Sequence, residues 1–474
     1  MANRHAGTAG GLSCLAARRN TIQGAALPGG NAVERLRWMC GIALAMACQM
    51  AMAGTALITQ VDYQGDDGGA VPTDAQYRNP VLAGFYPDPS AIRVGNAFYL
   101  VTSSFGYFPG LPVFKSSDLV KWTQIGNAID RPGQINYGND ALTRGLFAAS
   151  ISHHDGTFYI ANTCFYCDGG NFLITAKDPA GPWSDPIWLD AKGIDPSLFF
   201  DDDGSAWLVN NDVPAGTLRY DGHRAIWLQQ LDLARMKLVG PRQVIVDSGF
   251  QPASNPEHIE GPHLFRRDGY YYLTAAEGGT GEQHAQMVYR SRQIAGPYEP
   301  WSGNPVLTQR DLDPARPAPI TSAGHAQFVE LADGSWWAVF LATRPYRGNH
   351  YTLGRETFLL PVQWRDGWPL VLPHGKAIPS VATRPPLPAG TQATPTSGPM
   401  HWSERFDGAR MPLPAVTQPV TLRVALDAAT VHVDFAVGDG QWQTLLERGD
   451  ASLLSTETAG GFLGATFGPY AYRP

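Results

Sequence analysis

The 474-residue chain has little charge for its length, because Asp, Glu, Lys and Arg make up only 16% of it. A globular domain usually has about 25%, so this surface is unusually neutral. The net charge is −7 and there is no basic block. This argues against nucleic acid as a partner, since phosphate binding needs clustered Lys and Arg. No run of 18 or more apolar residues follows residue 54, so no membrane span is expected there.

A helical pattern is almost absent after residue 60, whereas turn-forming and aromatic residues are abundant. The chain has 52 Gly, 38 Pro, 13 Trp, 18 Tyr and 20 Phe. Glycine and proline among many large aromatic residues are typical of short strands joined by turns, and not of disorder. A chain of this length can form a large core and a second domain.

The first 53 residues are predicted to be an N-terminal extension and a signal peptide. Arg35-Leu36-Arg37 precede an apolar run, Trp38 to Met52, which ends in an Ala-x-Ala site at residues 51–53. A basic segment, a short apolar run and a small-residue cleavage site form a secretory signal. We therefore expect translation to begin near Arg35, a signal peptide within residues 35–53, and a secreted or periplasmic protein. A buried helix is the alternative reading of the apolar run.

Cysteine is scarce, and three of the five cysteines fall in this segment. One of them, Cys48, would instead end the signal if the protein were a lipoprotein. The other two are Cys164 and Cys167, in a C-x-x-C motif. Such a motif in a cytosolic protein would indicate redox chemistry or zinc, but there is no second C-x-x-C and no nearby pair of histidines. We expect a local disulfide or two free thiols.

The strongest organisational signal is a hairpin that occurs five times. Each copy has an apolar strand, a turn with glycine and an aromatic strand, and Asp precedes the glycine in four copies. The turn glycines are 61, 48, 65 and 65 residues apart: Gly95, Gly156, Gly204, Gly269 and Gly334. Five units of about four strands predict an all-β, five-bladed β-propeller. A sandwich would not give so regular a period, and a TIM barrel would need helices between its strands.

We expect this propeller to occupy residues 77–374, after a leader at 54–76. Residues 375–400 contain six prolines and few large apolar residues, and are predicted to form a linker. Residues 401–474 again have the pattern of strands, but they are too few for a full sandwich domain.

The innermost strand of each blade lines the channel of a propeller, and its first residue lies near one face. Alignment of the five hairpins places these residues at one equivalent position: Asp88, Phe147, Asp195, Glu260 and His325. Asp-Pro-Ser could instead be a local turn, but three carboxylates in register repel each other and favour a function. Glycoside hydrolysis needs such a cluster, because one carboxylate activates water and another protonates the leaving oxygen.

The motifs at these positions resemble those of glycoside hydrolase family 43, a five-bladed propeller family of β-xylosidases, α-L-arabinofuranosidases and arabinanases. The similar stretches lie between about residues 79 and 370. They are NPVLAGFYPDPS, GIDPSLFFDDDG, NPEHIEGPHLF, AAEGG, GHAQFV and GRETFLLPVQWRDGWP. The last stretches are most similar to the exo-acting β-xylosidase branch.

The resemblance implies a role for each matching residue. Asp88 in YPDPS corresponds to the general base, and Glu260 in IEGPH to the general acid. Asp195 in GIDPS corresponds to the Asp that orients the acid and tunes its pKa. Arg355 in GRET matches an Arg that contacts the sugar in the −1 subsite. His325 in GHAQF matches a His near the axis that in several members binds calcium or its waters. The family is inverting, which implies base and acid carboxyls roughly 6.5–9.5 Å apart.

The chain departs from the family pattern in two places. Phe147 keeps an aromatic ring that could stack on the sugar, but the Ala-Pro that usually follows is replaced by Ala148-Ala149. Residues 401–474 resemble the start and the end of the C-terminal β-sandwich of the branch, without its middle. We therefore expect a shortened β-sandwich remnant that persists only by lying against the propeller.

These features predict an exo-acting glycoside hydrolase that releases xylose or arabinose from xylan or arabinoxylan oligosaccharides in one inverting step. We expect no required cofactor, with Ca²⁺ possible in the channel. The alternative is a non-catalytic carbohydrate-binding propeller with a decayed accessory domain, but the presence of all three carboxylates favours catalysis. The two pentoses are similar in size, so the sequence does not separate xylosidase from arabinofuranosidase.

Overall fold

The structure is a computed structural model. It describes residues 55–56, 60–65, 72–137, 142–167, 169–390, 400–405, 413–414, 420–427, 429–459, 461–462 and 464. The predicted signal peptide lies outside these residues. The chain divides into two compact units, Met1–Leu57 with Met411–Pro419, and Ile58–Arg410 with Val420–Pro474. In the first unit the structure describes β1 (Thr55–Ala56) and β27 (Leu413–Pro414), which pair antiparallel. All that follows concerns the second unit.

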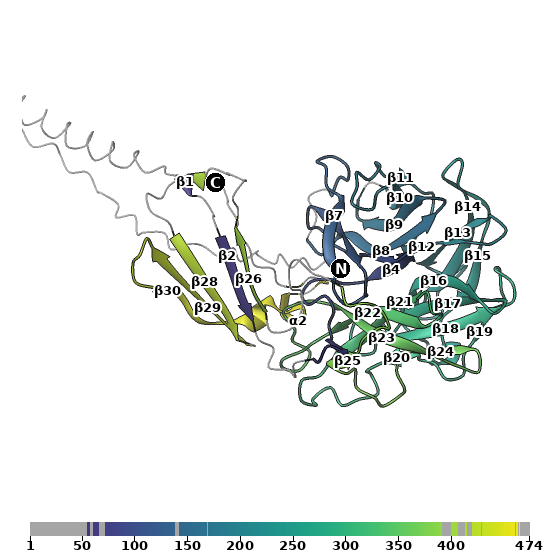
Figure 1. Cartoon of the computed structure of the whole chain (residues 1–474). Helices are drawn as coiled ribbons and strands as arrows, with labels where there is room; N and C mark the ends of the chain where they lie inside the picture. The colour runs from purple at the N-terminus through teal and green to yellow at the C-terminus, as the bar shows by residue number, and fades with distance from the viewer. Residues whose placement is uncertain are drawn as a thin grey trace, which may run out of the picture. The chain divides into compact units, whose positions relative to one another are not determined.

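Five antiparallel sheets, formed one after another along the chain, make up most of this unit (Figure 1). The first has β4 (Ser90–Val94), β5 (Ala97–Val101), β6 (Gly110–Ser116) and β7 (Thr123–Ile129). The second has β8 (Gly145–His154), β9 (Thr157–Phe165), β10 (Gly170–Ala176) and β11 (Ile187–Trp188). The third has β12 (Ile194–Phe200), β13 (Ala206–Asp212), β14 (Ala225–Asp232) and β15 (Lys237–Asp247).

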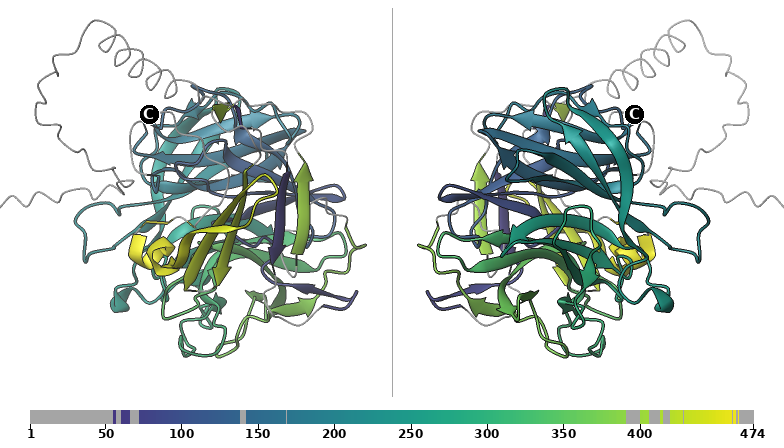
Figure 2. Two further views of the ribbon diagram at one scale, coloured as in Figure 1. Left: turned by 90° about the vertical axis from the view of Figure 1, so that its left-hand side faces the viewer. Right: turned by 90° about the vertical axis from the view of Figure 1, so that its right-hand side faces the viewer.

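The fourth sheet has β16 (Glu260–Arg267), β17 (Tyr270–Glu277), β18 (Ala285–Ser291) and β19 (Glu299–Pro300), with β20 (Leu307–Thr308) also paired to β18. The fifth has β21 (Thr321–Glu330), β22 (Trp336–Thr343), β23 (Glu356–Arg365) and β24 (Trp368–Leu370). The first strands of the sheets contact one another in order, and β21 returns to contact β4. The sheets therefore close into a ring, and the predicted five-bladed propeller is confirmed; Figure 2 shows it from two further sides.

Five hydrophobic clusters hold the ring together, and each lies between two neighbouring blades. Between the first and fifth blades, for example, Trp122 packs in one cluster with Val339 and Leu359. Because each blade contributes to two clusters, central strands are buried on both faces, as in β22, where all eight residues are buried. Burial of apolar surface at every blade junction is the main stabilising term of the ring.

The segments that flank the blades tie the ring ends together. β3 (Gln76–Arg78) pairs with β25 (Val381–Thr383), although some 300 residues separate them. The Asn79 side chain accepts a hydrogen bond from the Leu359 backbone N–H and donates one to its carbonyl, both at 2.9 Å. The first and last parts of the propeller are thus joined by paired backbone and by a buried amide.

Two of the four Asp-Gly hairpin turns have the conformation that this dipeptide predicts, whereas the turns at Asp203-Gly204 and Asp333-Gly334 have a positive φ at the glycine alone. Asp155 and Gly156 have φ of 47° and 67°, and Asp268 and Gly269 have 49° and 72°. Two successive positive φ angles define the turn that matches the twist of paired strands. The spacing of these turns along the chain therefore marked the blades correctly.

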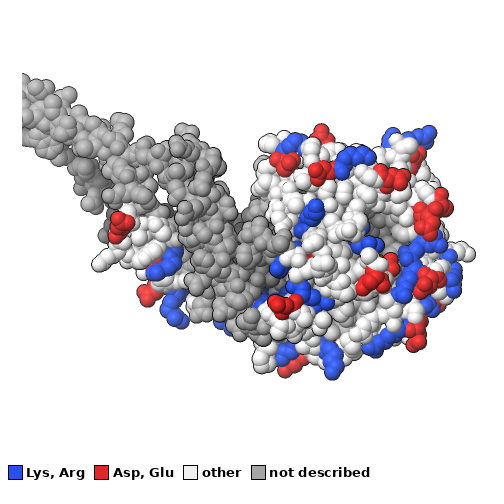
Figure 3. Space-filling model, viewed as in Figure 1, with Lys and Arg blue, Asp and Glu red and all other residues white. Residues whose placement is uncertain are grey.

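Helix is as scarce as the sequence predicted. The described residues hold one short α-helix, α2 (Thr456–Ala459), and two 3₁₀ segments, η1 (Pro252–Ser254) and η2 (Ala451–Leu454). None of the helices in this part of the chain could cross a lipid bilayer. On the face in Figure 3, Lys and Arg are interspersed with Asp and Glu, which agrees with the absence of a basic block in the sequence.

After the propeller the chain forms two smaller sheets. β28 (Val420–Asp427), β29 (Thr430–Val437) and β30 (Gln443–Asp450) make an antiparallel sheet of three strands. β26 (Met400–Arg405) pairs with β2 (Gln60–Gly65), which belongs to the segment that the sequence suggested as a leader. In that segment Val61 and Tyr63 alternate with polar residues, which is the period of a strand.

Candidate active site

Four of the five innermost strands, all but β4, share an irregularity at the end where the predicted site residues lie. A bulge interrupts the pairing between Leu146 and Ala149, between Ile194 and Ser197, and at the corresponding points of β16 and β21. Asp88, Asp195 and His325 have φ between 52° and 56°. This left-handed conformation is unfavourable for residues with a side chain and is concentrated at functional sites.

The fourth blade differs by one residue from the first, third and fifth blades, whose left-handed residues are Asp88, Asp195 and His325. There the left-handed position is Gly261, with φ of 55°, and Glu260 precedes it. A Cβ on Gly261 would lie 2.8 Å from the His325 imidazole. The glycine therefore leaves room for that ring, and the carboxylate comes from the residue before. Counting residues to the turn glycine aligned Glu260 with Asp195 and did not reveal this offset.

Asp88 lies at the centre of a polar cluster, with only 4% of its surface exposed. Its Oδ1 accepts a hydrogen bond from Arg355 Nη1 at 2.6 Å and lies 3.9 Å from His325 Nδ1. Its Oδ2 accepts a hydrogen bond from the Ser103 hydroxyl. The carboxylate is thereby paired with a cation and held in one orientation.

Asp195 and Glu260 form a coupled pair of carboxyls. Burial, reinforced by repulsion from Asp88, raises the pKa of Glu260 to about 7. Burial, followed by repulsion from Glu260 and Asp88, also raises the pKa of Asp195 well above its usual value. The Gly261 N–H opposes that shift by donating to Asp195 Oδ2 at 3.1 Å. Because the two groups repel each other, their titration belongs to the pair.

Aromatic rings enclose the side of the site next to Arg355. The Arg355 guanidinium lies 5.6 Å from the ring centres of both Phe105 and Phe462. These two rings are stacked, with centres 5.8 Å apart, and Phe147 lies 5.3 Å from Phe105. Arg355 Nε is buried and has no partner among the described residues. A cation with an unpaired donor beside aromatic rings suits a sugar, which has hydroxyls and an apolar C–H face.

The C-x-x-C motif closes the turn after β9, next to these rings. Cys164 and Cys167 form a disulfide, one of the two states expected from the sequence. Between them, Phe165 stacks on Phe147 with ring centres 4.6 Å apart, and Tyr166 packs edge-on against Phe165. The predicted sugar-stacking ring of Phe147 is therefore covered on one side by Phe165.

Three buried histidines lie in this region: His263, His284 and His325. Burial lowers the pKa of all three, to about 3 for His263 and about 4 for His284, so their rings are neutral near pH 7. A neutral imidazole could ligate a metal, but calcium prefers six or more oxygen ligands. No group of three or more His, Cys, Asp or Glu that could hold a metal occurs among the residues the structure describes. These side chains alone do not fit a calcium site.

The structure thus brings all six predicted site residues into one region: Asp88, Phe147, Asp195, Glu260, His325 and Arg355. Sequence reasoning missed Ser103, Phe105, His263 and His284. It did not place Phe462 at the site either. Phe462 N–H donates to Thr143 Oγ1 at 3.0 Å across 319 residues of sequence, so no local pattern could have indicated this position.

Comparison with known proteins agrees with the geometry. Residues 77–369 match the sequence model of glycosyl hydrolases family 43, and residues 400–474 match that of the beta xylosidase C-terminal concanavalin A-like domain. A xylosidase/arabinosidase of Butyrivibrio fibrisolvens is 49% identical over 298 residues. A non-reducing end alpha-L-arabinofuranosidase of Bacteroides ovatus is 44% identical over 301 residues. Each alignment covers 62% of this chain, and 56% and 53% of the respective relative, so the chain spans about half of their length.

Solved structures show the same fold. A GH43_12 protein retrieved from a capybara gut metagenome aligns with 87% of this chain and 98% of its own, with a TM-score of 0.77 and 28% identity. A xylan beta-1,4-xylosidase from Bacillus halodurans aligns with 82% of this chain and 95% of its own, with a TM-score of 0.70 and 28% identity. Since the family model spans more than half of the sequence and the propeller carries the family's motifs, the chain belongs to glycosyl hydrolases family 43.

Proposed function

We propose that this protein is an exo-acting glycoside hydrolase that releases xylose or arabinose from xylan or arabinoxylan oligosaccharides with inversion. The observation that supports this most is the pairing of an anionic Asp88 with a Glu260 whose pKa is raised to about 7. One group can accept a proton from water while the other donates one to the leaving oxygen. The relatives named as xylosidases and arabinofuranosidases support the choice of pentoses.

In the proposed step, a water between Asp88 and the sugar attacks the anomeric carbon. Asp88 takes the proton of that water as the new C–O bond forms. Glu260 gives its proton to the glycosidic oxygen as the old C–O bond breaks, so the leaving sugar departs as an alcohol. Both carboxyls then return to their starting states by exchanging a proton with solvent. A single displacement inverts the anomeric centre.

The neighbouring groups would hold the reactants. Ser103 and Arg355 orient the Asp88 carboxylate, which keeps the base aimed at the attacking water. The unpaired Nε of Arg355 is available to a sugar hydroxyl. Phe147 and Phe462 would contact the apolar face of the ring and exclude water, and the buried Phe105 packs behind them. Asp195, whose carboxylate is held by the Gly261 N–H, would orient Glu260 and influence its titration.

Secretion belongs to the same proposal. The apolar run from Trp38 to Met52 and the Ala-x-Ala site support export to the periplasm or the medium. Determination of the N-terminus of the mature protein would test export.

Parallel kinetics on p-nitrophenyl β-xylopyranoside and p-nitrophenyl α-L-arabinofuranoside would test the activity. We expect turnover of at least one, and NMR of the reaction should show the inverted sugar first. A retained anomer would contradict the water-activation mechanism. Binding of xylo-oligosaccharides without release of pentose would favour a carbohydrate-binding propeller instead.

A further inference from the structure

The turn after β9 carries two aromatic side chains between the cysteines of the disulfide. Phe165 is the last residue of β9, and Tyr166 follows it. Phe165 is 37% exposed and Tyr166 is 58% exposed. Exposed apolar side chains that cluster beside a pocket often have a function. The proposed mechanism uses neither of these two residues.

The disulfide anchors this turn in the core of the propeller. Cys164 is fully buried in the hydrophobic cluster between the first and second blades, and Cys167 packs against the same cluster. Because both ends of the turn are anchored there, the two residues between the cysteines lie outside the core, beside the rings of the site.

The backbone of the turn is not one that its residues prefer. Tyr166 has φ of 65°, in the left-handed region that a large side chain disfavours. The hydrogen bond across the turn, from Cys167 N–H to the Cys164 carbonyl, is long, at 3.4 Å. Gly169 and Gly170 come next, and glycine restricts the chain least. Local preferences therefore do not fix this turn, whereas the covalent link between the cysteines does.

Phe165 transmits the position of the turn to the sugar pocket through Phe147. The two rings are nearly parallel, at 20°, with centres 4.6 Å apart. On its other sides Phe147 lies 5.3 Å from Phe105 and packs edge-on against Phe462 at 6.1 Å. The Asn162 side chain also donates to the Phe147 carbonyl at 2.7 Å. Phe147 is therefore held between the disulfide-closed turn and the rings next to Arg355.

The outer end of this stack is held as well. The Arg144 guanidinium lies 3.9 Å from the centre of the Tyr166 ring, and Tyr166 packs edge-on against Phe165 with centres 4.5 Å apart. A cation over an aromatic face is attracted by the ring. Arg144 directly precedes β8, the strand that carries Phe147. The turn and the start of β8 thus contact each other through two pairs of side chains.

We propose that the Cys164–Cys167 disulfide and Phe165 form a positioning device for the sugar pocket, which holds the ring of Phe147 in the orientation that a bound pentose contacts. The inference rests on the proposed function. Phe165 and the cysteines act through Phe147 and touch no reacting atom. They should therefore affect binding of the sugar more than the chemical step.

Phe165→Ala removes the stacked ring and leaves the disulfide in place. KM for the preferred p-nitrophenyl pentoside should rise about 2- to 10-fold, and kcat should change by less than about twofold. Phe165→Tyr keeps the stack and should have the KM of the unaltered protein. An unchanged KM in Phe165→Ala, or an equal loss in the Tyr variant, would overturn the proposal.

The disulfide itself can be removed in two independent ways. Cys164→Ala/Cys167→Ala removes it by substitution. In the unaltered protein the phosphine TCEP cleaves the S–S bond: phosphorus gains the oxygen atom of a water, the two sulfurs gain its hydrogens, and two thiols and a phosphine oxide result. Both treatments should raise KM as Phe165→Ala does, and TCEP should not change the double variant. Unchanged KM in protein that thiol titration shows to be reduced would overturn the role of the disulfide.

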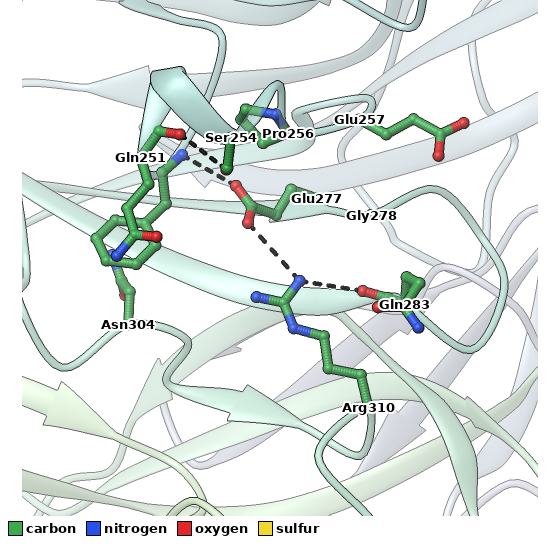
Figure 4. Close-up of a pocket in the computed structure, with 10 residues that line it drawn as sticks. Gln251, Ser254, Pro256, Glu257, Glu277, Gly278, Gln283, Asn304 and Arg310 are labelled. Atoms are coloured by element: carbon green, nitrogen blue, oxygen red, sulfur yellow. Dashed lines mark hydrogen bonds and ion pairs between the residues drawn. The ribbon is translucent and has the colours of Figure 1, made fainter.

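The control is another exposed residue with a left-handed backbone. Gln251, with φ of 53°, lies in the loop before β16 and lines a cavity of about 410 Å³ on the fourth blade (Figure 4). Gln251→Ala changes the same kind of position as Tyr166→Ala, on a different blade. Tyr166→Ala should raise KM about twofold, since Tyr166 supports Phe165 from outside. Gln251→Ala should leave KM and kcat unchanged. An equal rise in KM in the two variants would count against the turn as the cause.

The failure of the proposed function can be told apart from the failure of this inference. If the unaltered protein hydrolyses no aryl pentoside, the proposed function fails. Calorimetric binding of D-xylose and L-arabinose to the oxidised and the reduced protein then decides the role of the disulfide alone. Weaker binding after reduction supports the positioning device, and equal or absent binding overturns it.

Discussion

The propeller and the region after β24 are both built from antiparallel strands, yet they bury their side chains to very different degrees. Every residue of β22 is buried between two blades. In the three-stranded sheet, residues 421–425 of β28 and 443–448 of β30 are all exposed. They include Leu422, Val424, Leu445 and Leu446. A blade has a neighbour on each face, whereas this sheet lacks cover over much of its described surface.

The segment that follows β30 packs against residues of the propeller, unlike the three-stranded sheet before it. His350 Nδ1 lies 3.0 Å from Ser455 Oγ, and Thr456 N–H donates to the Tyr351 carbonyl at 3.4 Å. Phe462 then stacks on Phe105 beside Arg355. The described part of the site therefore includes one ring from the C-terminal region, and none from the strands of the exposed sheet. This agrees with the expectation that the shortened region lies against the propeller.

The largest loss of activity should come from a substitution at the axis of the propeller, where Asp88 lies. Asp88→Asn removes the base without changing its shape, and we expect kcat on every substrate to fall by about 10³- to 10⁴-fold. The melting temperature should fall far less. Asp203→Asn, in an exposed turn of the third blade, is the control. Retention of most activity in Asp88→Asn would remove this residue from the role of base.

Glu260→Gln should reduce the rate of hydrolysis to an extent that depends on the leaving group of the substrate. Hydrolysis of xylobiose, or of the corresponding arabinobiose, should fall by about 10²- to 10⁴-fold because its leaving oxygen needs a proton. Nitrophenyl pentosides should be affected much less, since nitrophenolate leaves unaided. The ratio of the two rates is the measurement. An equal loss on both classes would contradict the assignment of Glu260 as the acid.

The stability of the two regions can be compared with matched leucines. Leu100, in β5, is 0% exposed, and Leu422, in β28, is 64% exposed. Leu100→Ala should lower the free energy of unfolding by about 2–5 kcal/mol, because it leaves a cavity between blades. Leu422→Ala should change it by less than about 0.5 kcal/mol. Urea unfolding of both variants gives the comparison. A similar cost at both positions would show that a partner or another segment covers the exposed sheet.

Much of the fold was accessible from the sequence, since its signals are local. The Asp-Gly turns and their spacing are features of short stretches, and they gave the number of blades. The carboxylates stand in motifs such as Asp-Pro-Ser, whose place at the start of an inner strand follows from the hairpin pattern. The one-residue offset at Glu260 was not accessible, because the two hairpin turns differ in length. Five residues lie between the paired Phe200 and Ala206, and two between Arg267 and Tyr270, so an equal count to the turn glycine does not give an equal place on the strand.

Contacts between distant segments had no sequence signal. Phe165 became part of the site only when β8 and β9 paired Gly145 with Phe165. Phe462 reached it through tertiary packing. Residue propensities also do not predict the positive φ angles in the loop at 248–258. Gln251 and His258 have left-handed backbone conformations that residues with a side chain disfavour. Tertiary contacts fix these positions.

Phe462 tests whether the C-terminal segment takes part in binding. Phe462→Ala should raise KM about tenfold, in line with loss of one aromatic contact of about 1.4 kcal/mol, and should change kcat less. Leu445→Ala, an exposed residue of the preceding sheet, is the control. Unchanged KM in the Phe462 variant would mean that the ring covers the propeller without touching the sugar.

Asp195→Asn should have the smallest effect of these substitutions on kcat/KM at the pH optimum. It should have the clearest effect on the pH dependence of kcat/KM. Asp195 and Glu260 repel each other, so the pair loses its last proton at a higher pH than Glu260 would alone. The acid must be protonated to act, and activity is therefore lost as pH rises through that pKa. Removing the Asp195 charge lowers the pKa, and the alkaline limb of kcat/KM should move to lower pH. The acid limb of the kcat/KM profile depends on the base, Asp88, and should move less. An alkaline limb that coincides with that of the unaltered protein and of Asp203→Asn would show that Asp195 only positions Glu260.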